Sequence, residues 1–351
     1  MPITDWNGGN LNKRMERMKD YPVVLYGAGK YGKQAMQNIN KYFSFLDVKY
    51  YIDDNRVRNQ GENIISLQEA IQKFGMDFYI LIANYYVKEV LEKIEKAGFD
   101  LSKVLFCSEL LIDDVNPQCL KEHDKDLKKV YEFLGDYKSK MIYRTMVESR
   151  FTKNIDVLCR TCDAIQYFPS DIWKMNDEEV FVDAGAYDGD TIEQFFKETD
   201  YKCKYIYAFE PDRTNYEKLK ERQYGEHVKI YNAGLYETTK KISFSANKGG
   251  SSKIEEDGEN KVQVYQFDEL ELPDKAITFI KMDIEGSELK ALEGMKQTIK
   301  KYKPKLAICI YHKFEDLWEL PLYIKKLVPE YQLYIRNYTS YLDEIVLYAA
   351  I

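Results

Sequence analysis

The sequence of 351 residues has no run of apolar residues long enough to cross a bilayer, which takes about 20 residues. Residues 1–9 also contain no apolar core of the kind that secretory leaders carry. We therefore expect a cytoplasmic protein that has no membrane partner.

Metal-ligand patterns are scarce, since the chain has only 3 histidines and 6 cysteines. A structural zinc site usually combines two CxxC pairs, or one such pair with a spaced pair of histidines. Only Cys159 and Cys162 form a CxxC, and His123, His227 and His312 do not supply the matching spacing. In a chain of this size the cysteines need not form a disulfide framework, so we expect free thiols.

Positive charge is in deficit, with 51 Lys and Arg against 58 Asp and Glu and a formal net charge of −7. A nucleic-acid partner is therefore not expected, because such a partner requires a surface that neutralises phosphates. Hydrophobic residues make up 45% of the chain, which indicates a folded core. The length suits about two domains.

Short apolar strands alternate with helical stretches in the N-terminal third, which is typical of a parallel sheet covered by helices. Strands are expected at residues 23–26, 48–52, 78–82 and 103–106, and helices at 30–43, 67–74 and 87–97. We predict a Rossmann-like domain of the nucleotide-binding type over residues 1–112.

A glycine-rich turn follows the first expected strand, with Gly27, Gly29 and Gly32 in the spacing G-x-G-x-x-G. Asp53 ends the second expected strand, where an acid would bind a ribose. Such a turn lets a phosphate approach the backbone at a helix N-terminus. The pattern predicts a nucleotide or nucleotide-sugar site, with a purely structural or oligomerising role as the alternative.

Residues 113–177 show helical spacing without a clear strand and predict a helical connector. Strand–helix alternation returns over residues 178–351, with strands expected at 179–183, 204–209, 228–231, 278–282 and 306–310. Two final strand-like runs, 331–337 and 344–351, predict a hairpin that places one antiparallel strand at the edge of the sheet. The expected fold class is α/β, with two Rossmann-like doubly wound domains joined by the connector.

A second glycine turn opens the C-terminal part, where Asp183 ends a strand and Gly185 and Gly189 bracket the turn into a helix. Glu210 ends the next strand, where its carboxylate can accept hydrogen bonds from a ribose diol. The turn contains no Arg or Lys for a pyrophosphate, which suits a nucleoside without phosphate such as S-adenosylmethionine.

Three acids, Asp283, Glu285 and Glu288, follow a further apolar strand, and His312 follows the strand after that. The carboxyl ends of parallel strands face one crevice, so these side chains are expected there. Capping of a helix start is the alternative for Glu285 or Glu288. A histidine in this place is a natural general base for a hydroxyl.

The segments VFVDAGAYDGDT, YAFEPD, IKMDIEGSELKALEGM and AICIYHKFEDLWELP together resemble the FkbM family of S-adenosylmethionine-dependent methyltransferases. The resemblance covers about residues 178–351. It implies the class I methyltransferase fold, whose seven-stranded sheet has an antiparallel last strand. It also implies a set of cofactor-binding residues, namely Asp183, Gly185, Ala186, Tyr187, Gly189, Thr191, Glu210, Asn232, Ala233 and Asp283.

The resemblance implies methylation of an oxygen on a sugar or secondary-metabolite hydroxyl, with a small-molecule or sugar acceptor. We expect His312 to take the hydroxyl proton and Asp283 to orient the base or the substrate. An alternative is Mg²⁺ held by Asp283 and Glu288, which would lower the pKa of the hydroxyl.

Two other functions stay open at this point: a nucleotide-binding regulatory protein without methyl transfer, and an NAD-dependent oxidoreductase that uses the Gly27–Gly32 turn. The acceptor is not readable from the sequence, and a homo-oligomer is compatible with it.

Overall fold

The computed structural model describes residues 11–53, 63–84, 87–106, 110, 117–152, 156–246, 252–254, 260–339 and 341–351. The chain forms two compact units, and the division falls within helix α7 (Tyr137–Thr152). The first unit comprises Met1–Val115 and Val147–Asp156, and the second comprises Asn116–Met146 and Val157–Ile351. No helix in the described part of the chain is long and apolar enough to span a membrane.

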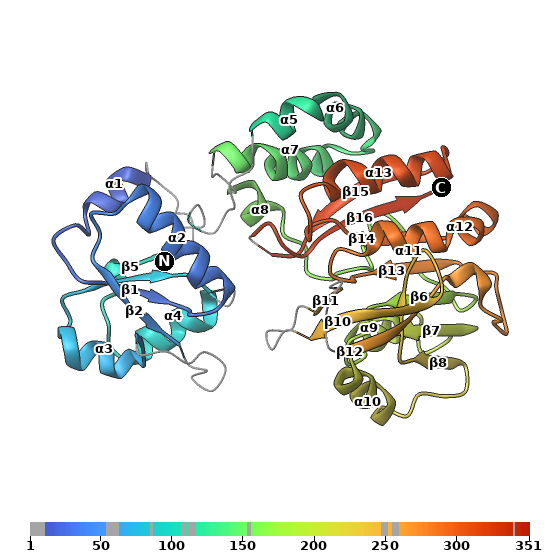
Figure 1. The fold of residues 1–351 in the computed structure, drawn as a ribbon, viewed down its shortest axis with the longest axis horizontal. Helices are drawn as coiled ribbons and strands as arrows, with labels where there is room; N and C mark the ends of the chain where they lie inside the picture. Colours follow the sequence, from blue (N-terminus) through green and yellow to red (C-terminus); the bar gives the residue numbers. More distant parts are fainter. Residues whose placement is uncertain are drawn as a thin grey trace. The chain divides into compact units, whose positions relative to one another are not determined.

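The first unit is built on a five-stranded parallel sheet in the order β3-β2-β1-β4-β5 (Figure 1). Its strands are β1 (Val23–Tyr26), β2 (Val48–Ile52), β3 (Ile64–Ile65), β4 (Tyr79–Ile82) and β5 (Val104–Phe106). Its helices are α1 (Leu11–Glu16), α2 (Lys30–Tyr42), α3 (Leu67–Phe74) and α4 (Val87–Lys96), with a 3₁₀ turn at Leu101–Lys103. All four side chains of β1 are buried, as expected for a central strand covered on both faces. The predicted Rossmann-like sheet is confirmed, with the short β3 added at its edge.

Four helices follow, α5 (Pro117–Glu122), α6 (Asp124–Phe133), α7 and α8 (Asp156–Thr161). In the second unit, α6 packs against α13 (Asp316–Leu327), and the chain after α6 reaches the main sheet. There Leu134 bridges to Leu333, and the Gly135 N–H donates to the Leu333 carbonyl at 2.8 Å. Further along, Tyr167, Phe168 and Trp173 are buried in the core of the same unit. This stretch of the chain therefore contributes directly to the second unit.

The second unit contains a seven-stranded sheet in the order β15-β16-β14-β13-β6-β7-β8. Its strands are β6 (Val180–Ala184), β7 (Tyr205–Phe209), β8 (Val228–Tyr231), β13 (Phe279–Met282), β14 (Lys305–Cys309), β15 (Gln332–Asn337) and β16 (Ile345–Ala350). The predicted antiparallel last strand is confirmed, since β16 runs antiparallel to both β14 and β15.

The expected place of this strand at the sheet edge is wrong, because β16 lies between β14 and β15. Its sequence IVLYAA is apolar throughout, and Ile345 to Ala349 are fully buried. The edge strand β15 contains Gln332, Arg336 and Asn337 instead. A continuous apolar run suits an interior strand that is covered on both faces.

Helices connect the strands of this sheet, namely α9 (Asp190–Glu198), α10 (Arg213–Glu221), α11 (Glu288–Gly294), α12 (Lys296–Tyr302) and α13. A second, four-stranded sheet in the order β11-β10-β12-β9 is inserted between β8 and β13 (Figure 1). Its strands are β9 (Gly234–Leu235), β10 (Lys240–Ala246), β11 (Ser252–Ile254) and β12 (Asn260–Tyr265), followed by a 3₁₀ turn at Phe267–Glu269. This inserted sheet was not predicted from the sequence.

Candidate functional site

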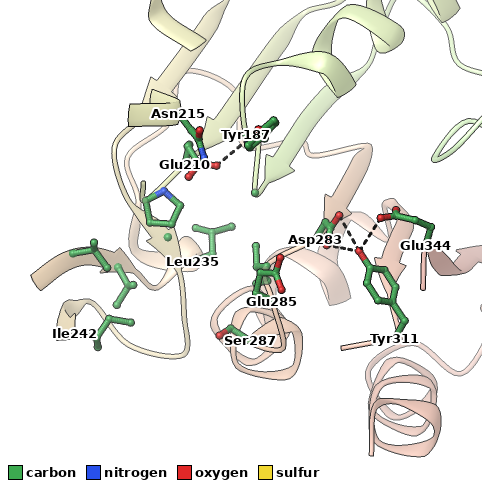
Figure 2. A pocket seen from close by; sticks show the side chains of 16 residues that line it. Tyr187, Glu210, Asn215, Leu235, Ile242, Asp283, Glu285, Ser287, Tyr311 and Glu344 are labelled. Carbon is green, nitrogen blue, oxygen red and sulfur yellow. Dashed lines mark hydrogen bonds between the residues drawn. The ribbon is translucent and has the colours of Figure 1, made fainter. Parts of the chain in front are cut away.

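A cavity of about 240 Å³ lies at the carboxyl ends of β6, β7, β13 and β14, within the second unit. Figure 2 shows apolar side chains such as Leu235 and Ile242 at one end and the group Asp283, Tyr311 and Glu344 at the other. Ligands of open α/β sheets bind in the crevice outside the carboxyl ends of the strands. The cavity is therefore the candidate site of this unit.

The glycine turn after β6 forms the floor of the cavity through a close backbone contact. Gly185 has a φ of +80°, and a Cβ at this position would lie 2.0 Å from the Asp283 carbonyl oxygen. The N–H groups of Gly185 and Ala186 donate to the Phe209 carbonyl at 3.0 and 3.1 Å. Only glycine fits here, because both the backbone angle and the neighbouring carbonyl exclude a side chain.

The end of the same turn starts helix α9. Gly189 is its N-cap residue with a φ of +92°, and Thr191 lies buried in the first turn. The Tyr224 hydroxyl donates to the Gly189 carbonyl at 3.2 Å. Gly189, Thr191 and Ala186 therefore shape the turn from beneath and do not themselves line the cavity.

Asp183 lies below the floor, where it is fully buried. The Lys281 ammonium lies 3.1 Å from its Oδ1 and donates to the Gly185 carbonyl at 2.6 Å. Burial raises the pKa of Asp183 to about 6, and the charge of Lys281 opposes this rise. Asp183 thus holds the turn through Lys281 and does not reach the cavity surface. Lys281 was not predicted as a site residue, because it lies in the middle of an expected strand.

Glu210 lines the cavity beside Tyr187, and each of its carboxylate oxygens accepts one backbone hydrogen bond. The Tyr187 N–H donates to Oε2 at 2.8 Å and the Asp212 N–H donates to Oε1 at 2.8 Å (Figure 2). Burial raises the pKa of Glu210 to about 7. A carboxylate offers about four lone-pair sites, so both oxygens can still accept a hydrogen bond from a ligand diol.

Asn232 and Ala233 lie just behind the cavity wall. The Asn232 side-chain amide donates to the carbonyls of Glu210 and Pro211 at 3.0 and 3.2 Å, and Ala233 is buried. The next two residues, Gly234 and Leu235, line the cavity instead.

The apolar end of the cavity is formed largely by the inserted sheet. Its lining side chains are Pro211, Leu235, Ile242, Val262 and Val264. Ile242 and Val262 face each other across the antiparallel β10–β12 pair. These residues give a flat ligand group an apolar surface next to Glu210.

The polar end gathers hydroxyls around Asp283. The Tyr167 hydroxyl donates to Oδ2 at 3.0 Å, and the Tyr311 hydroxyl donates to Oδ1 at 3.3 Å. The same Tyr311 oxygen lies 3.5 Å from Oε1 of Glu344 (Figure 2). Sequence reasoning did not single out Glu344, because it follows no strand end and lies far from the motifs.

His312 is brought next to Asp283, as the sequence predicted, but it is enclosed by carboxylates. Its Nε2 lies 3.3 Å from Asp283 Oδ1 and 3.6 Å from Glu285 Oε2, and its Nδ1 lies 3.0 Å from Glu288 Oε1. The side chain is only 8% exposed. Burial lowers its pKa, but Asp283 and Glu288 outweigh this effect and raise the pKa of His312 to about 10.

At neutral pH His312 is therefore an imidazolium, which has no lone pair to accept a proton. Burial acts to raise the pKa of Asp283, but His312, Lys281 and Tyr167 together hold it well below its ordinary value. In this arrangement neither residue of the predicted pair is a strong base.

The predicted metal pair, Asp283 and Glu288, has His312 between its members. One atom from each of the three residues lies within 4.8 Å of the others, which is close enough for one cation to contact all three. However, the two nitrogens of His312 face different carboxylates, so no single nitrogen points to a place between them. Glu288 also accepts the N–H groups of Ile284 and Gly286, which fixes it to the loop. The residues as they lie form an ion-pair network, and the metal alternative stays a prediction.

The glycine turn of the first unit is tightly packed. A Cβ at Gly27 would lie 2.4 Å from the Ala83 carbonyl oxygen, and one at Gly32 would lie 1.9 Å from the Gly27 carbonyl oxygen. Asp53 accepts the Ala28 N–H at 2.8 Å, while no atom lies within 4 Å of a Cβ built on Gly29. Packing thus accounts for two of the glycines, and the nucleotide site at this turn stays a prediction.

Residues 183–342 match the family model described as the methyltransferase FkbM domain. The fold is similar to that in the crystal structure of methyltransferase FkbM from Methylobacillus flagellatus KT, with a TM-score of 0.70 and 23% sequence identity. The match covers 99% of this chain and 96% of that one. An rRNA methylase from Streptococcus thermophilus has 15% identity and a TM-score of 0.33, covering 50% of this chain and 87% of its own. No curated protein matches the chain.

Proposed function

We propose that this chain, whose residues 183–342 form a domain of the FkbM methyltransferase family, transfers the methyl group of S-adenosylmethionine to a sugar or secondary-metabolite hydroxyl. The observation that carries the proposal is the cavity at the strand ends, which is apolar at one end and lined by carboxylates at the other. The resemblance to the FkbM family found in the sequence is confirmed over these residues.

The shape of the cavity supports the adenosine half of the proposed cofactor. The apolar end beside Leu235 and Ile242 suits an adenine ring, and Glu210 lies where its two oxygens would accept the ribose hydroxyls. Gly185 also lines the cavity, so the backbone of its turn would lie beside the methionine part. The reacting carbon would then lie toward Asp283.

The charge of the cavity supports a cationic cofactor and an uncharged acceptor. Four carboxylates line it, those of Glu210, Asp283, Glu285 and Glu344, and no Lys, Arg or His is among the lining residues that the structure describes. Carboxylates attract a sulfonium and repel phosphate, so phosphorylated acceptors are disfavoured in this cavity. We therefore favour a hydroxyl acceptor that carries no anionic group.

The reaction is an in-line displacement at the sulfonium carbon. A bond forms between the acceptor oxygen and the methyl carbon, the carbon–sulfur bond breaks with its electron pair on sulfur, and the hydroxyl proton goes to a base. Positioning of the two reactants supplies much of the rate enhancement. His312 and Glu288 anchor the loop that carries Asp283 and Glu285, and so fix the polar end of the cavity.

Calorimetric titration with S-adenosylmethionine and with NADH tests the cofactor. We expect S-adenosylmethionine to bind and Glu210→Gln to weaken that binding about tenfold or more at pH 8.5, because a hydrogen bond to a charged acceptor contributes about 1.5–3 kcal/mol. Glu226→Gln, which removes an exposed carboxylate outside the cavity, is the matched control. Binding of NADH alone would support the oxidoreductase alternative. If neither S-adenosylmethionine nor NADH bound, the remaining alternative would be a regulatory protein without methyl transfer.

Transfer of a labelled methyl group to a panel of uncharged sugars, methyl glycosides and sugar phosphates tests the acceptor class. The proposal predicts transfer to uncharged acceptors and a lower kcat/KM for the phosphates. EDTA in the assay should leave the rate unchanged, since ion pairs with His312 hold Asp283 and Glu288 without a metal.

A further inference from the structure

We infer that Glu344 is the base that receives the acceptor's proton, an inference that rests on the methyl transfer proposed above. Glu344 lies in the loop before β16 and lines the polar end of the cavity opposite Asp283 (Figure 2). Sequence reasoning placed this residue only at the start of the last strand, without a role.

The two oxygens of Glu344 have different surroundings. The Gln166 side-chain amide donates to Oε2 at 2.6 Å, which orients the carboxylate. Among the hydrogen bonds of the described residues, the other oxygen, Oε1, takes part only in the long contact of 3.5 Å with the Tyr311 hydroxyl. Oε1 is therefore able to accept a hydrogen bond from a hydroxyl in the cavity.

The backbone holds Glu344 in an unfavourable conformation. Its φ is +51°, in the left-handed region that costs a non-glycine residue about 1–2 kcal/mol. The hairpin fixes this conformation, since the Tyr338 N–H donates to the Glu344 carbonyl at 3.1 Å and the Thr339 hydroxyl donates to Asp343 at 2.9 Å. Strained residues held by their surroundings are concentrated at functional sites.

Two of the other acidic groups at the cavity, Asp283 and Glu210, are less suitable as a base. Asp283 already receives hydrogen bonds from Tyr167 and Tyr311 and an ion pair from His312. Glu210 uses both oxygens on backbone N–H groups at the far end of the cavity. Of these three carboxylates, Glu344 has the least occupied oxygen at the end where the methyl group would lie.

The titration of Glu344 agrees with this assignment. Burial raises its pKa to about 7, helped by the negative charges of Asp283 and Asp343, while the Gln166 hydrogen bond and the charge of His312 oppose the rise. A general base works best when its pKa lies near the operating pH. Its charged or titratable neighbours are thus Asp283, Asp343, His312 and Tyr311.

In the proposed step, Oε1 of Glu344 takes the hydroxyl proton while the acceptor oxygen bonds to the methyl carbon. The electron pair of the broken carbon–sulfur bond stays on sulfur, and the proton leaves to solvent after the neutral product departs. No oxidant, reductant or metal is needed, so the atoms and charges balance.

The test compares wild type with Glu344→Gln and Glu344→Asp on an uncharged sugar that wild type methylates in the panel above. We expect wild-type kcat to rise with pH up to about 7 and then level off. Glu344→Gln should lower kcat about 100-fold or more and abolish this acidic limb. Glu344→Asp should keep the limb at a reduced rate.

Two measurements separate a base from a structural role. S-adenosylmethionine affinity and the thermal midpoint of Glu344→Gln should stay close to those of wild type. Glu226→Gln, which removes an exposed carboxylate outside the cavity, is the matched control and should keep the acidic limb.

A Glu344→Gln enzyme with kcat within threefold of wild type and an intact acidic limb would overturn this inference but would leave the proposed function standing. A wild-type enzyme that binds S-adenosylmethionine but methylates no hydroxyl in the panel would overturn the proposed function, and this inference with it. If Glu344→Gln does not fold, the profile of Glu344→Asp decides, and an unchanged kcat in that variant contradicts the base.

Discussion

His312 is a buried cation that holds three acidic residues together. Its nitrogens face Asp283, Glu285 and Glu288 at 3.0 to 3.6 Å, and the side chain is almost fully removed from solvent. Removing one partner of such a pair leaves the other charges buried and uncompensated. The residue therefore has a large structural role in addition to any part in the reaction.

Replacing His312 by Gln should lower the free energy of unfolding of the second unit by about 3–5 kcal/mol at pH 6. The pKa of His312 is about 10 in the folded protein, above its ordinary value of 6.5. Its contribution is therefore complete below about pH 6.5 and is lost as the pH rises through about 10. Urea denaturation of wild type and variant at pH 6 and at pH 10.5 measures this.

The difference in the free energy of unfolding between wild type and His312→Gln should be smaller at pH 10.5 than at pH 6. His227→Gln provides the control, since His227 contacts the ring of Phe196 and lies away from this cluster. An equal difference in the free energy of unfolding at both pH values would show that the ion pairs of His312 are not the cause of the lost stability.

The positions of single site residues could be predicted from the sequence where the residue directly follows a strand. Asp283 and His312 follow buried apolar runs, and the rule that strand ends share a crevice brought them together correctly. Lys281 was missed because a charged residue in the middle of a strand is ordinarily interpreted as lying on the face of the sheet that points to solvent. The contact between Tyr167 and Asp283 joins residues that are 116 positions apart in the sequence, and no local pattern encodes such a contact.

The inserted sheet supplies the apolar end of the cavity through alternate side chains of β10. Ile242 lines the cavity, while the adjacent Lys241 is exposed. Successive strand residues point to opposite faces, so the two positions form a matched pair on one strand.

We expect Ile242→Ala to weaken S-adenosylmethionine binding about tenfold. The lost contact removes roughly 1–2 kcal/mol of apolar burial from the adenine end. Lys241→Ala should leave the affinity within about twofold of wild type. Calorimetry with both variants measures the effect, and equal affinities in the two would place the adenosine elsewhere.

Elements with strong periodicity were predicted from the sequence, and those without it were not. The parallel strands of the five-stranded and seven-stranded sheets are short apolar runs, which are easily recognised in the sequence. Strands β10 and β12 carry polar residues on one face and pair only with each other and with short neighbours. The place of β16 was mistaken because pairing order depends on contacts across the sheet, which the order along the chain does not give.

At the scale of the whole molecule, residues before β6 are part of the core of the second unit. Tyr167, Phe168 and Trp173 are buried in its main hydrophobic cluster. Arg336, which is only 2% exposed, forms ion pairs with Asp136 and Asp171 at 2.6 Å. A chain that begins at residue 178 lacks all of these partners.

We therefore expect a fragment of residues 117–351 to unfold cooperatively and a fragment of residues 178–351 not to fold. Loss of a buried aromatic side chain costs about 3–5 kcal/mol, and three such losses reach the total stability of about 5–15 kcal/mol of a typical domain. Thermal unfolding followed by near-ultraviolet circular dichroism distinguishes the two fragments. A cooperative transition in the shorter fragment would contradict this expectation.

The carboxylates of the cavity also bear on what happens after the proposed transfer. The sulfonium cofactor loses its positive charge when the methyl group leaves, whereas Glu210, Asp283, Glu285 and Glu344 remain in place. We therefore expect these carboxylates to attract the sulfonium form more strongly than the spent thioether. Because this attraction is electrostatic, salt should reduce the preference. If the proposed transfer takes place, the loss of this charge favours release of the spent thioether.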